Sequence, residues 1–298
     1  VGDADERFTE DALRIMRAVR FSAQLGFFME EKTKTAIRGH AENLRKVSAE
    51  RIQTELTKLV TSPHPEYLRS AWETGITAVF LPEFDRLMCT PQKNPHHCLN
   101  VGEHTLRAMQ AVRPDKILRL AMLFHDFGKP DCASADENGT DHFHGHGAVS
   151  SKMAEEILKR LRYDNDTIDR VRELVYWHDM EILPEKRAVR RAASKVGKEL
   201  FPLLLEVKQA DLAAQSDYQR PQKEEWLRSL HDIYEQIQEE GDCLSLKDLA
   251  VTGRDLIAAG MKPGPQLGQT LQNLLQLVLE DPSRNSKEYL LSNLPKET

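Results

Sequence analysis

The feature that most constrains the fold is the spacing of the apolar residues, which recur three and four positions apart along most of the chain. This is the period of an amphipathic helix, and Gly and Pro stand between the periodic segments, where helices end. No stretch alternates between apolar and polar residues over the length of a strand. The sequence therefore predicts an all-α fold.

The clearest helix is expected from about Thr9 to Gln24. Thr9 is the residue type that caps a helix N-terminus, and Gly26 is the type that ends one. The same spacing predicts further helices over residues 31–40, 48–60, 65–74, 253–259 and 265–280.

Breaks in this pattern divide the chain into three parts. Three prolines crowd a linker at residues 82–95, and a second helical part begins near Val101. Gly241-Asp242 then separates a short tail. The predicted parts are residues 1–90, 91–240 and 241–298. Residues 131–147, in the middle part, form a loop longer than an ordinary connection, which indicates function.

Composition excludes a membrane-spanning protein. No apolar run approaches the roughly 20 residues that cross a bilayer, and no signal peptide opens the chain. We therefore expect a cytoplasmic protein without a membrane partner, with its four scattered cysteines reduced. The formal net charge is −6, so any RNA contact must come from local basic patches. The chain begins at Val1 in mid-motif, and we interpret it as a fragment of a longer protein.

Imidazole and carboxylate side chains recur in order through the middle part. They are His104, His125, Asp126, His146, His178 and Asp211. The doublet His125-Asp126 ends an apolar helix that Gly128 breaks, and two adjacent helical residues can reach one ion only near such an end. Asp211 lies on an apolar helix, where a carboxylate is costly unless it is paired or bound to metal. Nitrogen and oxygen ligands of these types suit Zn, Fe, Ni, Co or Mn.

The order His, His-Asp, Asp resembles the HD phosphohydrolase superfamily. The resemblance implies a first metal ion held by four side chains: His104, His125, Asp126 and Asp211. His146 and His178 match the extra histidines of members that hold a second ion. Lys129 resembles the family lysine that neutralises a substrate phosphate, so the implied catalytic residues are His125, Asp126 and Lys129.

The implied activity is phosphoester hydrolysis on a 2′,3′-cyclic nucleotide or a nucleotide phosphate. In the superfamily the metal lowers the pKa of a bound water, and the hydroxide attacks phosphorus. The native metal, the number of ions and the physiological substrate stay open. His142 and His144 either support the metal ligands or are exposed.

A different motif occupies the amino-terminal helix: Glu10-Asp11-x-x-Arg14-x-x-Arg17, followed by Arg20-Phe21. Asp11, Arg14 and Arg17 are three residues apart and line one side of the helix, while the apolar residues between them face inward. By itself this pattern describes a solvated face with an ion pair.

This motif closely resembles the segment after the catalytic head of class II CCA-adding tRNA nucleotidyltransferases and bacterial poly(A) polymerases. The resemblance implies that Asp11 and Arg14 read the incoming base. A carboxylate accepts from the exocyclic amine of cytosine or adenine and a guanidinium donates to the ring, whereas uracil and guanine leave these groups unpaired. Arg17 is expected to orient this pair or to contact phosphate.

The resemblance extends over nearly the whole chain. Residues 47–56, 74–76 and 81–84 resemble neck and RNA-binding helices, which assigns 1–90 to that role and 91–240 to the HD domain. Residues 251–257 and 260–268 resemble the tRNA-contacting tail domain, although the Gly and Pro there also suit a tight turn. The basic run 186–198 faces either tRNA or water, and we favour water.

The family's head, with paired aspartates that hold two Mg ions, is absent from these residues. We therefore expect that this chain alone does not add nucleotides, and that tRNA, CTP and ATP are partners of the full-length protein. Whether that protein adds CCA, CC or A, and whether it forms a homodimer, stays open.

Three other interpretations of the sequence are open. A poly(A) polymerase relative shares the amino-terminal motif but usually lacks an intact HD set. A free-standing HD nucleotide phosphohydrolase explains neither that motif nor the tail. A metal-free RNA-binding module with decayed HD residues is separable from the others by elemental analysis.

Overall fold

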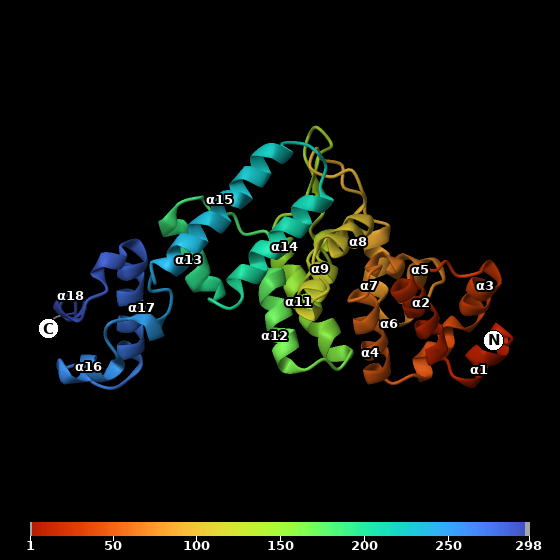
Figure 1. Ribbon diagram of the computed structural model, residues 1–298, viewed down its shortest axis with the longest axis horizontal. Coiled ribbons are helices and arrows are strands. Elements are labelled where there is room, and N and C mark those ends of the chain that lie inside the picture. Colours follow the sequence, from red (N-terminus) through yellow and green to blue (C-terminus); the bar gives the residue numbers. More distant parts are fainter. Residues whose placement is uncertain (1, 296–298) are drawn as a thin grey trace. The chain divides into compact units, whose positions relative to one another are not determined.

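A computed structural model of the protein describes residues 2–295, and it confirms the all-α prediction (Figure 1). Within those residues the one sheet is a two-stranded antiparallel hairpin. Its strands are β1 (Ser134–Ala135) and β2 (Asp141–His142), with Ser134 opposite His142. None of the helices in the described part of the chain has the length and apolar content that a membrane crossing needs.

The chain forms two compact units. The first contains the residues up to 179 together with 206–223, and the second contains 180–205 and the residues from 224 onward. The predicted division into 1–90, 91–240 and 241–298 concerns function rather than compactness, and it stays a prediction.

The first half of the first unit holds short and medium helices. They are α1 (Ala4–Glu10), α2 (Leu13–Leu25), α3 (Glu31–His40), η1 (Ala41–Lys46), α4 (Ala49–Val60), η2 (Pro65–Tyr67), α5 (Leu68–Glu73), α6 (Thr77–Phe80) and α7 (Pro82–Met88). α2 packs on α4 and buries Leu13, Met16 and Val19, which confirms the predicted inward face. The predicted helices over 31–40 and 48–60 coincide with α3 and α4, whereas 65–74 is divided between η2 and α5.

The predicted start of the first helix at Thr9 is wrong. Thr9 lies inside α1, and the helix is interrupted at Asp11, whose backbone is extended with φ −147° and ψ 104°. Asp11 Oδ1 accepts a hydrogen bond from the Leu13 amide at 3.1 Å, so its side chain caps α2 instead of continuing one long helix. The predicted end is confirmed, because Gly26 takes φ +68° and terminates α2.

The second half of this unit is built on a buried helix. Its elements are α8 (Val101–Ala111), α9 (Lys116–Phe124), α10 (Lys129–Cys132), the hairpin, α11 (His146–Arg160), α12 (Asn165–Trp177), the end of α14 (Phe201–Ala214) and the start of α15 (Arg220–Glu239). Residues 117–124 of α9 are all buried, and α11 and α12 pack against each other and against α9.

The turn after α9 brings α11 close. A Cβ at Gly128 would lie 2.7 Å from the carbonyl oxygen of His146, so only glycine allows this approach. The Gly128 amide donates to Ser150 Oγ at 2.8 Å. This contact places the first turn of α11 beside the His125-Asp126 doublet.

The second unit contains the remaining helices and the other parts of α14 and α15. They are α13 (Lys186–Val196), η3 (Leu246–Asp248), α16 (Gly253–Ala258), α17 (Pro265–Glu280), η4 (Pro282–Arg284) and α18 (Lys287–Ser292). α16 and α17 match the helices predicted over 253–259 and 265–280, and they pack on each other.

Candidate functional site

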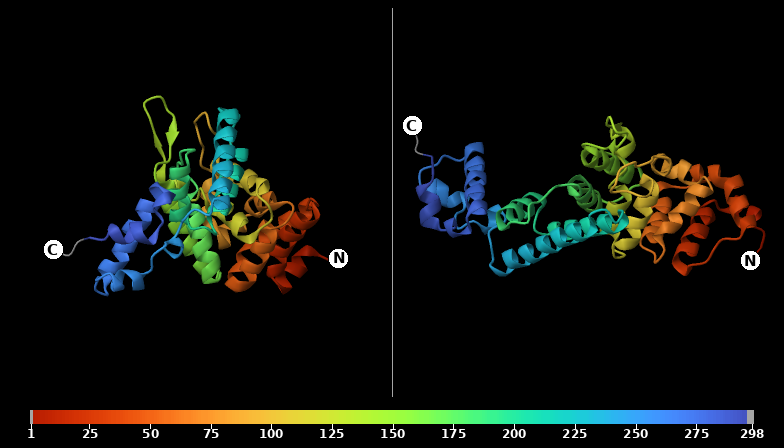
Figure 2. Two further views of the ribbon diagram at one scale, coloured as in Figure 1. Left: turned by 60° about the vertical axis from the view of Figure 1, so that its left-hand side comes forward. Right: turned by 90° about the horizontal axis from the view of Figure 1, so that it is seen from above.

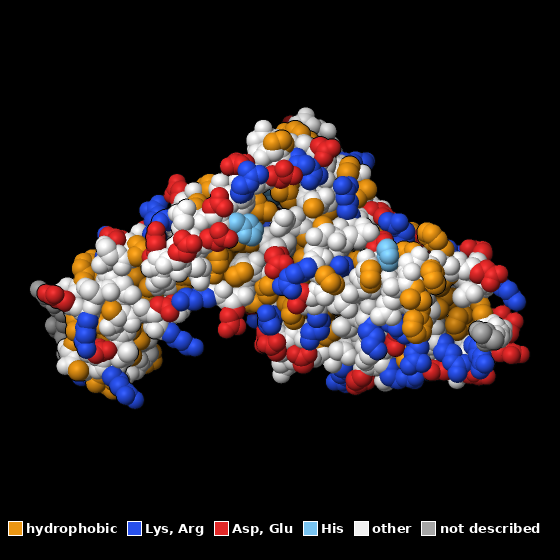
Figure 3. Space-filling view, in the orientation of Figure 1, with side chains coloured by type: hydrophobic (Ala, Val, Ile, Leu, Met, Phe, Trp, Pro, Cys, Tyr) orange, Lys and Arg blue, Asp and Glu red, His pale blue; other side chains and the backbone are white. Residues whose placement is uncertain are grey.

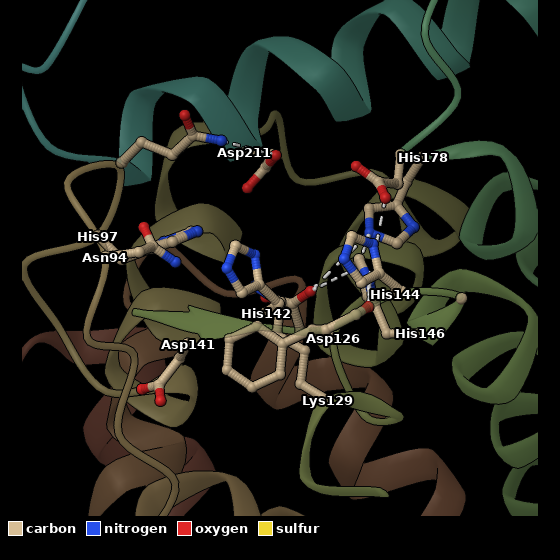
Figure 4. A pocket seen from close by; sticks show the side chains of 14 residues that line it. Asn94, His97, Asp126, Lys129, Asp141, His142, His144, His146, His178 and Asp211 are labelled. Atoms are coloured by element: carbon tan, nitrogen blue, oxygen red, sulfur yellow. Dashed lines mark hydrogen bonds and ion pairs between the residues drawn. The ribbon is translucent and has the colours of Figure 1, made fainter. Parts of the chain in front are cut away.

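The six predicted metal ligands lie together in the first unit, in two sets. Within each set the ligand atoms lie within 4.8 Å of one another. The first set is His104, His125 and Asp211, and the second is Asp126, His146 and His178. Figure 4 shows Asp126, His146, His178 and Asp211 directed toward one cavity.

Most of these side chains stand at helix ends. His125 and Asp126 directly follow α9, and His178 directly follows α12. His146 opens α11, and Asp211 lies in the last turn of α14. A helix end leaves carbonyl groups without an intrahelical partner, and these carbonyls are available to orient the imidazoles.

Backbone carbonyls set the tautomer of three imidazoles. His125, His146 and His178 each place Nδ1 on the carbonyl oxygen three residues earlier, at 2.7, 2.8 and 2.6 Å. Because a carbonyl only accepts, each Nδ1 carries a proton, and the neutral form of each ring presents a lone pair at Nε2. This arrangement is typical of histidines that bind metal through Nε2.

Two of these lone pairs face each other, because Nε2 of His146 lies 3.0 Å from Nε2 of His178. Two acceptors at this distance are compatible only with a proton or a metal ion that they share. Nε2 of His125 lies 3.3 Å from Nε2 of His104, which also lies 2.9 Å from Asp211 Oδ1. Nitrogen and carboxylate donors of this kind suit a transition-metal ion, so the residues present fit the predicted group.

Asp126 contacts both sets. Its Oδ2 lies 3.2 Å from His125 Nε2 and 3.6 Å from His104 Nε2. Its Oδ1 lies 3.4 Å from His146 Nε2 and 3.8 Å from His178 Nε2. The carboxylate is buried, and one side chain therefore joins the two sets.

The site attracts positive charge. Burial alone raises the pKa of Asp126, but the nearby His125 and Lys129 outweigh it and hold that pKa well below its usual range. Burial lowers the pKa of His125, yet the adjacent Asp126 carboxylate raises it above the ordinary value. The pKa of His178 is lowered to about 3 by burial, aided by the charge of His125. The Asp126 carboxylate thus stays ionised beside these cationic groups.

Lys129 supplies one such charge. Its Nζ lies 2.8 Å from Asp126 Oδ2 and donates to Gln92 Oε1 at 2.7 Å. The side chain is buried, and it forms part of the cavity wall. The predicted phosphate-binding lysine is thus paired with the carboxylate that joins the two sets.

A cavity of about 250 Å³ opens over the two sets. The hairpin forms part of its wall and is joined to the preceding loop by two hydrogen bonds between Lys93 and Asp141, at 3.0 and 2.7 Å. Figure 2 shows the hairpin and this loop extending on the same side of the first unit. His142 and His144 line the cavity with their ring centres 5.6 Å apart; the His142 side chain is 40% exposed and His144 is exposed.

Three residues near the ligands were missed by the sequence analysis. His97 lines the cavity with its ring 4.9 Å from that of His104, and burial lowers its pKa to about 3. Gln215 donates to Asp211 Oδ2 at 3.1 Å, and Lys208 donates to the His178 carbonyl at 2.7 Å. Gln215 could have been predicted, because it lies four residues, about one helical turn, after Asp211. His97 could not, because it lies in a loop where no helical spacing relates it to the ligands.

The amino-terminal motif forms ion pairs across helices. Arg51 Nη2 on α4 lies 3.0 Å from Asp11 Oδ2, and Arg14 Nη1 lies 2.5 Å from Glu10 Oε2. Arg17 Nε lies 3.4 Å from Glu55 Oε1. Asp11 and Arg14, predicted to act together on a base, thus each pair with another residue.

Asp11 stays ionised in this arrangement. Burial opposes ionisation, but the Leu13 amide and the Arg51 guanidinium outweigh it and lower the pKa of Asp11. Figure 3 shows Lys and Arg side chains gathered along the edge of the first unit over α1 and α4.

The basic run 186–198 pairs with acids of its own unit. Arg190 Nη1 lies 3.1 Å from an Asp242 oxygen, and its Nε donates to the Leu279 carbonyl at 2.9 Å. Lys186 lies 2.5 Å from Glu240. These cations therefore hold α13 against neighbouring segments.

Two family models match the sequence. One, described as the probable RNA and SrmB-binding site of polymerase A, matches residues 26–88. The other, described as tRNA nucleotidyltransferase domain 2, matches residues 146–294, which is half of the chain. The chain belongs to the CCA-adding tRNA nucleotidyltransferase family. The predicted family membership is confirmed.

Individual members of the family cover nearly all of this chain. The CC-adding tRNA nucleotidyltransferase of Thermus thermophilus is 34% identical over 93% of this chain and 64% of its own length. The A-adding tRNA nucleotidyltransferase of Deinococcus radiodurans is 28% identical over 92% of this chain and 65% of its own length. The crystal structure of the Bacillus stearothermophilus CCA-adding enzyme in complex with CTP has a TM-score of 0.65 at 25% sequence identity. The match covers 98% of this chain and 62% of that chain. The chain thus spans less than two thirds of these relatives.

Proposed function

We propose that this chain is part of an enzyme that adds nucleotides to tRNA 3′ ends from CTP and ATP, and that its centre is a metal-dependent HD phosphohydrolase. Family membership supports the first half of the proposal. The second half depends on one observation above all, the Asp126 carboxylate that faces both sets of imidazoles.

The residues that would hold metal are the two sets, with Asp126 shared between them. His104, His125, Asp126 and Asp211 would hold one ion, and Asp126, His146 and His178 would hold a second. A bound transition-metal ion supplies Lewis acidity, which activates water and offsets the charge of a phosphate. The chain's contribution is to fix the imidazole tautomers through Nδ1 and to exclude bulk water by burying the donors.

The cavity wall supports a phosphoester substrate. Lys129 brings an ammonium group to the wall beside Asp126, and once Asp126 shares its charge with metal this ammonium is available to a phosphate. Gln215 holds Asp211 in place from one helical turn away. A 2′,3′-cyclic nucleotide or a terminal phosphate of RNA presents the required phosphoester.

Hydrolysis of 2′,3′-cyclic AMP with added Ni, Co or Mn tests this half, alongside elemental analysis of the purified protein. We expect turnover in the wild type and its loss in Asp211→Asn. The matched control is Asp217→Asn, because Asp217 has 97% of its side chain exposed and belongs to neither set. Absence of turnover with metal shown to be bound would refute the hydrolase.

The base-reading role of Asp11 and Arg14 is the second part of the proposal. Asp11 is ionised and accepts hydrogen bonds, as recognition of an exocyclic amine requires. Pairing with Arg51 restrains its carboxylate and makes Arg51 a positioning residue.

Nucleotide selection by the full-length enzyme tests this role. In Asp11→Ala and Arg14→Ala, the preference for CTP and ATP over UTP and GTP should fall about tenfold or more. Asp5→Ala, an exposed carboxylate on α1, is the control. Unchanged preference in both variants would remove the base-reading role.

A poly(A) polymerase is a second candidate, because residues 26–88 match the model described for polymerase A. The two candidates differ in product. With ATP alone and a tRNA that ends in CC, the proposed enzyme adds one A, whereas a poly(A) polymerase extends a long tail.

A further inference from the structure

An exposed aromatic surface lies on the first unit, in the second half of α2 and the loop that follows it. Its large apolar side chains have exposed fractions from 49% to 91%. They are Phe21, Leu25, Phe27 and Phe28. Figure 3 shows hydrophobic side chains gathered over α2 and α5. A contiguous group of this kind on a water-exposed unit indicates a binding surface.

Local structure places these rings outward. Gly26 ends α2 with φ +68°, and the Phe27 amide returns to the Ser22 carbonyl at 3.2 Å. This motif usually buries its last apolar residue against the helix, but Phe27 stays 66% exposed. A Cβ at Gly26 would lie 3.0 Å from His64 Nε2, so the glycine brings the following loop next to η2.

Two of the rings have one side supported and the other side open. The Arg20 guanidinium lies 3.7 Å from the centre of the Phe21 ring and is held by the buried Glu55 at 2.5 Å. Phe28 stacks on Tyr67 with ring centres 6.2 Å apart and planes 28° apart. Each ring therefore has a partner on one side and exposes its other face to a ligand.

A cleft of about 220 Å³ separates the loop from η2 and α5. Phe27 and Phe28 form one side, and Tyr67, Arg69 and Ser70 form the other. Fixed aromatic faces with hydroxyl and guanidinium groups at their edge match an unpaired nucleobase, which needs a stacking surface and in-plane hydrogen-bond partners.

Charge favours RNA over an apolar protein partner. Arg17 precedes Phe21 by one turn on α2, with 46% of its side chain exposed. Arg51 adds a second guanidinium from α4, with 50% of its side chain exposed. Carboxylates of Glu66 and Glu73 line the cleft, so phosphates are expected toward the arginines and bases over the rings.

We propose that Phe21 and Phe28, the latter backed by Tyr67, form a stacking surface for the unpaired nucleotides at the 3′ end of the RNA substrate. This inference rests on the proposed tRNA 3′-end function. It specifies the part of the RNA that is bound and the residues that bind it.

The test measures RNA affinity of the full-length enzyme at one fixed salt concentration. One probe is an RNA hairpin with three unpaired 3′ nucleotides, and the other is the same hairpin with a blunt end. Phe21→Leu and Phe28→Leu keep the apolar character but remove the ring. Each should weaken binding of the extended hairpin about tenfold and leave the blunt hairpin unchanged, while Phe28→Trp retains binding.

Tyr176→Leu is the matched control, because Tyr176 is an exposed aromatic residue of α12 in the same unit. If Phe28→Leu binds the extended hairpin like the wild type, or weakens both hairpins equally, the surface takes an apolar protein segment and the inference is overturned. If the wild type binds neither hairpin, the proposed tRNA function itself fails.

Discussion

The first unit buries charge between α2 and α4 and also around Asp126, and these two places balance that charge differently. Between the helices, Glu55 accepts from Arg20 at 2.5 Å and from Arg17 at 3.4 Å. Each buried acceptor there has a donor from the same chain. Around Asp126, the Nε2 atoms of two pairs of imidazoles lie 3.0 and 3.3 Å apart.

This difference separates a structural network from a binding site. A buried polar group without its complement is costly, so a chain keeps such a group where a ligand completes it. The pair of Glu55 and Arg20 is complete without any ligand. The imidazole sets have more acceptors than donors, and Lys129 alone adds an ammonium group at Asp126. The following four changes test this distinction, in order of decreasing effect.

The largest effect is expected from Asp126→Asn. Because one carboxylate joins both sets, its loss should lower the metal content and reduce hydrolysis about a thousandfold. Elemental analysis and initial rates measure these two quantities, with Asp217→Asn as the control. Wild-type metal content in Asp126→Asn would mean that the two sets do not share this ligand.

Glu55→Ala should lower the free energy of unfolding by about 3–5 kcal/mol, because it leaves Arg20 buried without a carboxylate. Metal content should not change. Urea unfolding measures the stability, and Glu50→Ala on the exposed side of α4 is the control. The double replacement Arg20→Met and Glu55→Leu should recover most of the loss. A Glu55→Ala protein as stable as the wild type would contradict a structural role for this network.

Metal removal should destabilise the wild type, because ligand binding to the folded state alone adds stability. At a metal concentration a hundredfold above the Kd, the gain is about 2.7 kcal/mol. Thermal unfolding after chelation and after Ni is restored measures it. His146→Ala should respond less, and Glu55→Ala should respond like the wild type. An equal response from His146→Ala would place the metal elsewhere.

The smallest effect is expected from Arg17→Ala. Its side chain is 46% exposed and its Nε lies 3.4 Å from Glu55, so its loss should cost less than about 1 kcal/mol of unfolding free energy. Urea unfolding beside Arg20→Ala provides the comparison. A cost as large as that of Arg20→Ala would show that both guanidinium groups balance Glu55 equally.

Much of the fold was predictable because its signals are local. The helical period marked α3, α4, α16 and α17, and Gly26 marked the end of α2. The break at Asp11 was missed, because the apolar period continues across it; there the Asp11 side chain accepts from the Leu13 amide and pairs with Arg51, forty residues away. The hairpin was missed because two-residue strands are too short to show alternation.

The ligand types and their order were also present in the sequence, since imidazole and carboxylate chemistry belongs to the residues themselves. Which ligands share a set was not, because that depends on where α9, α11, α12 and α14 meet. Only the tertiary structure showed that Asp126 faces both sets, that Lys129 pairs with it and that His97 enters the wall. Such contacts join segments far apart in the chain, and no local period encodes them.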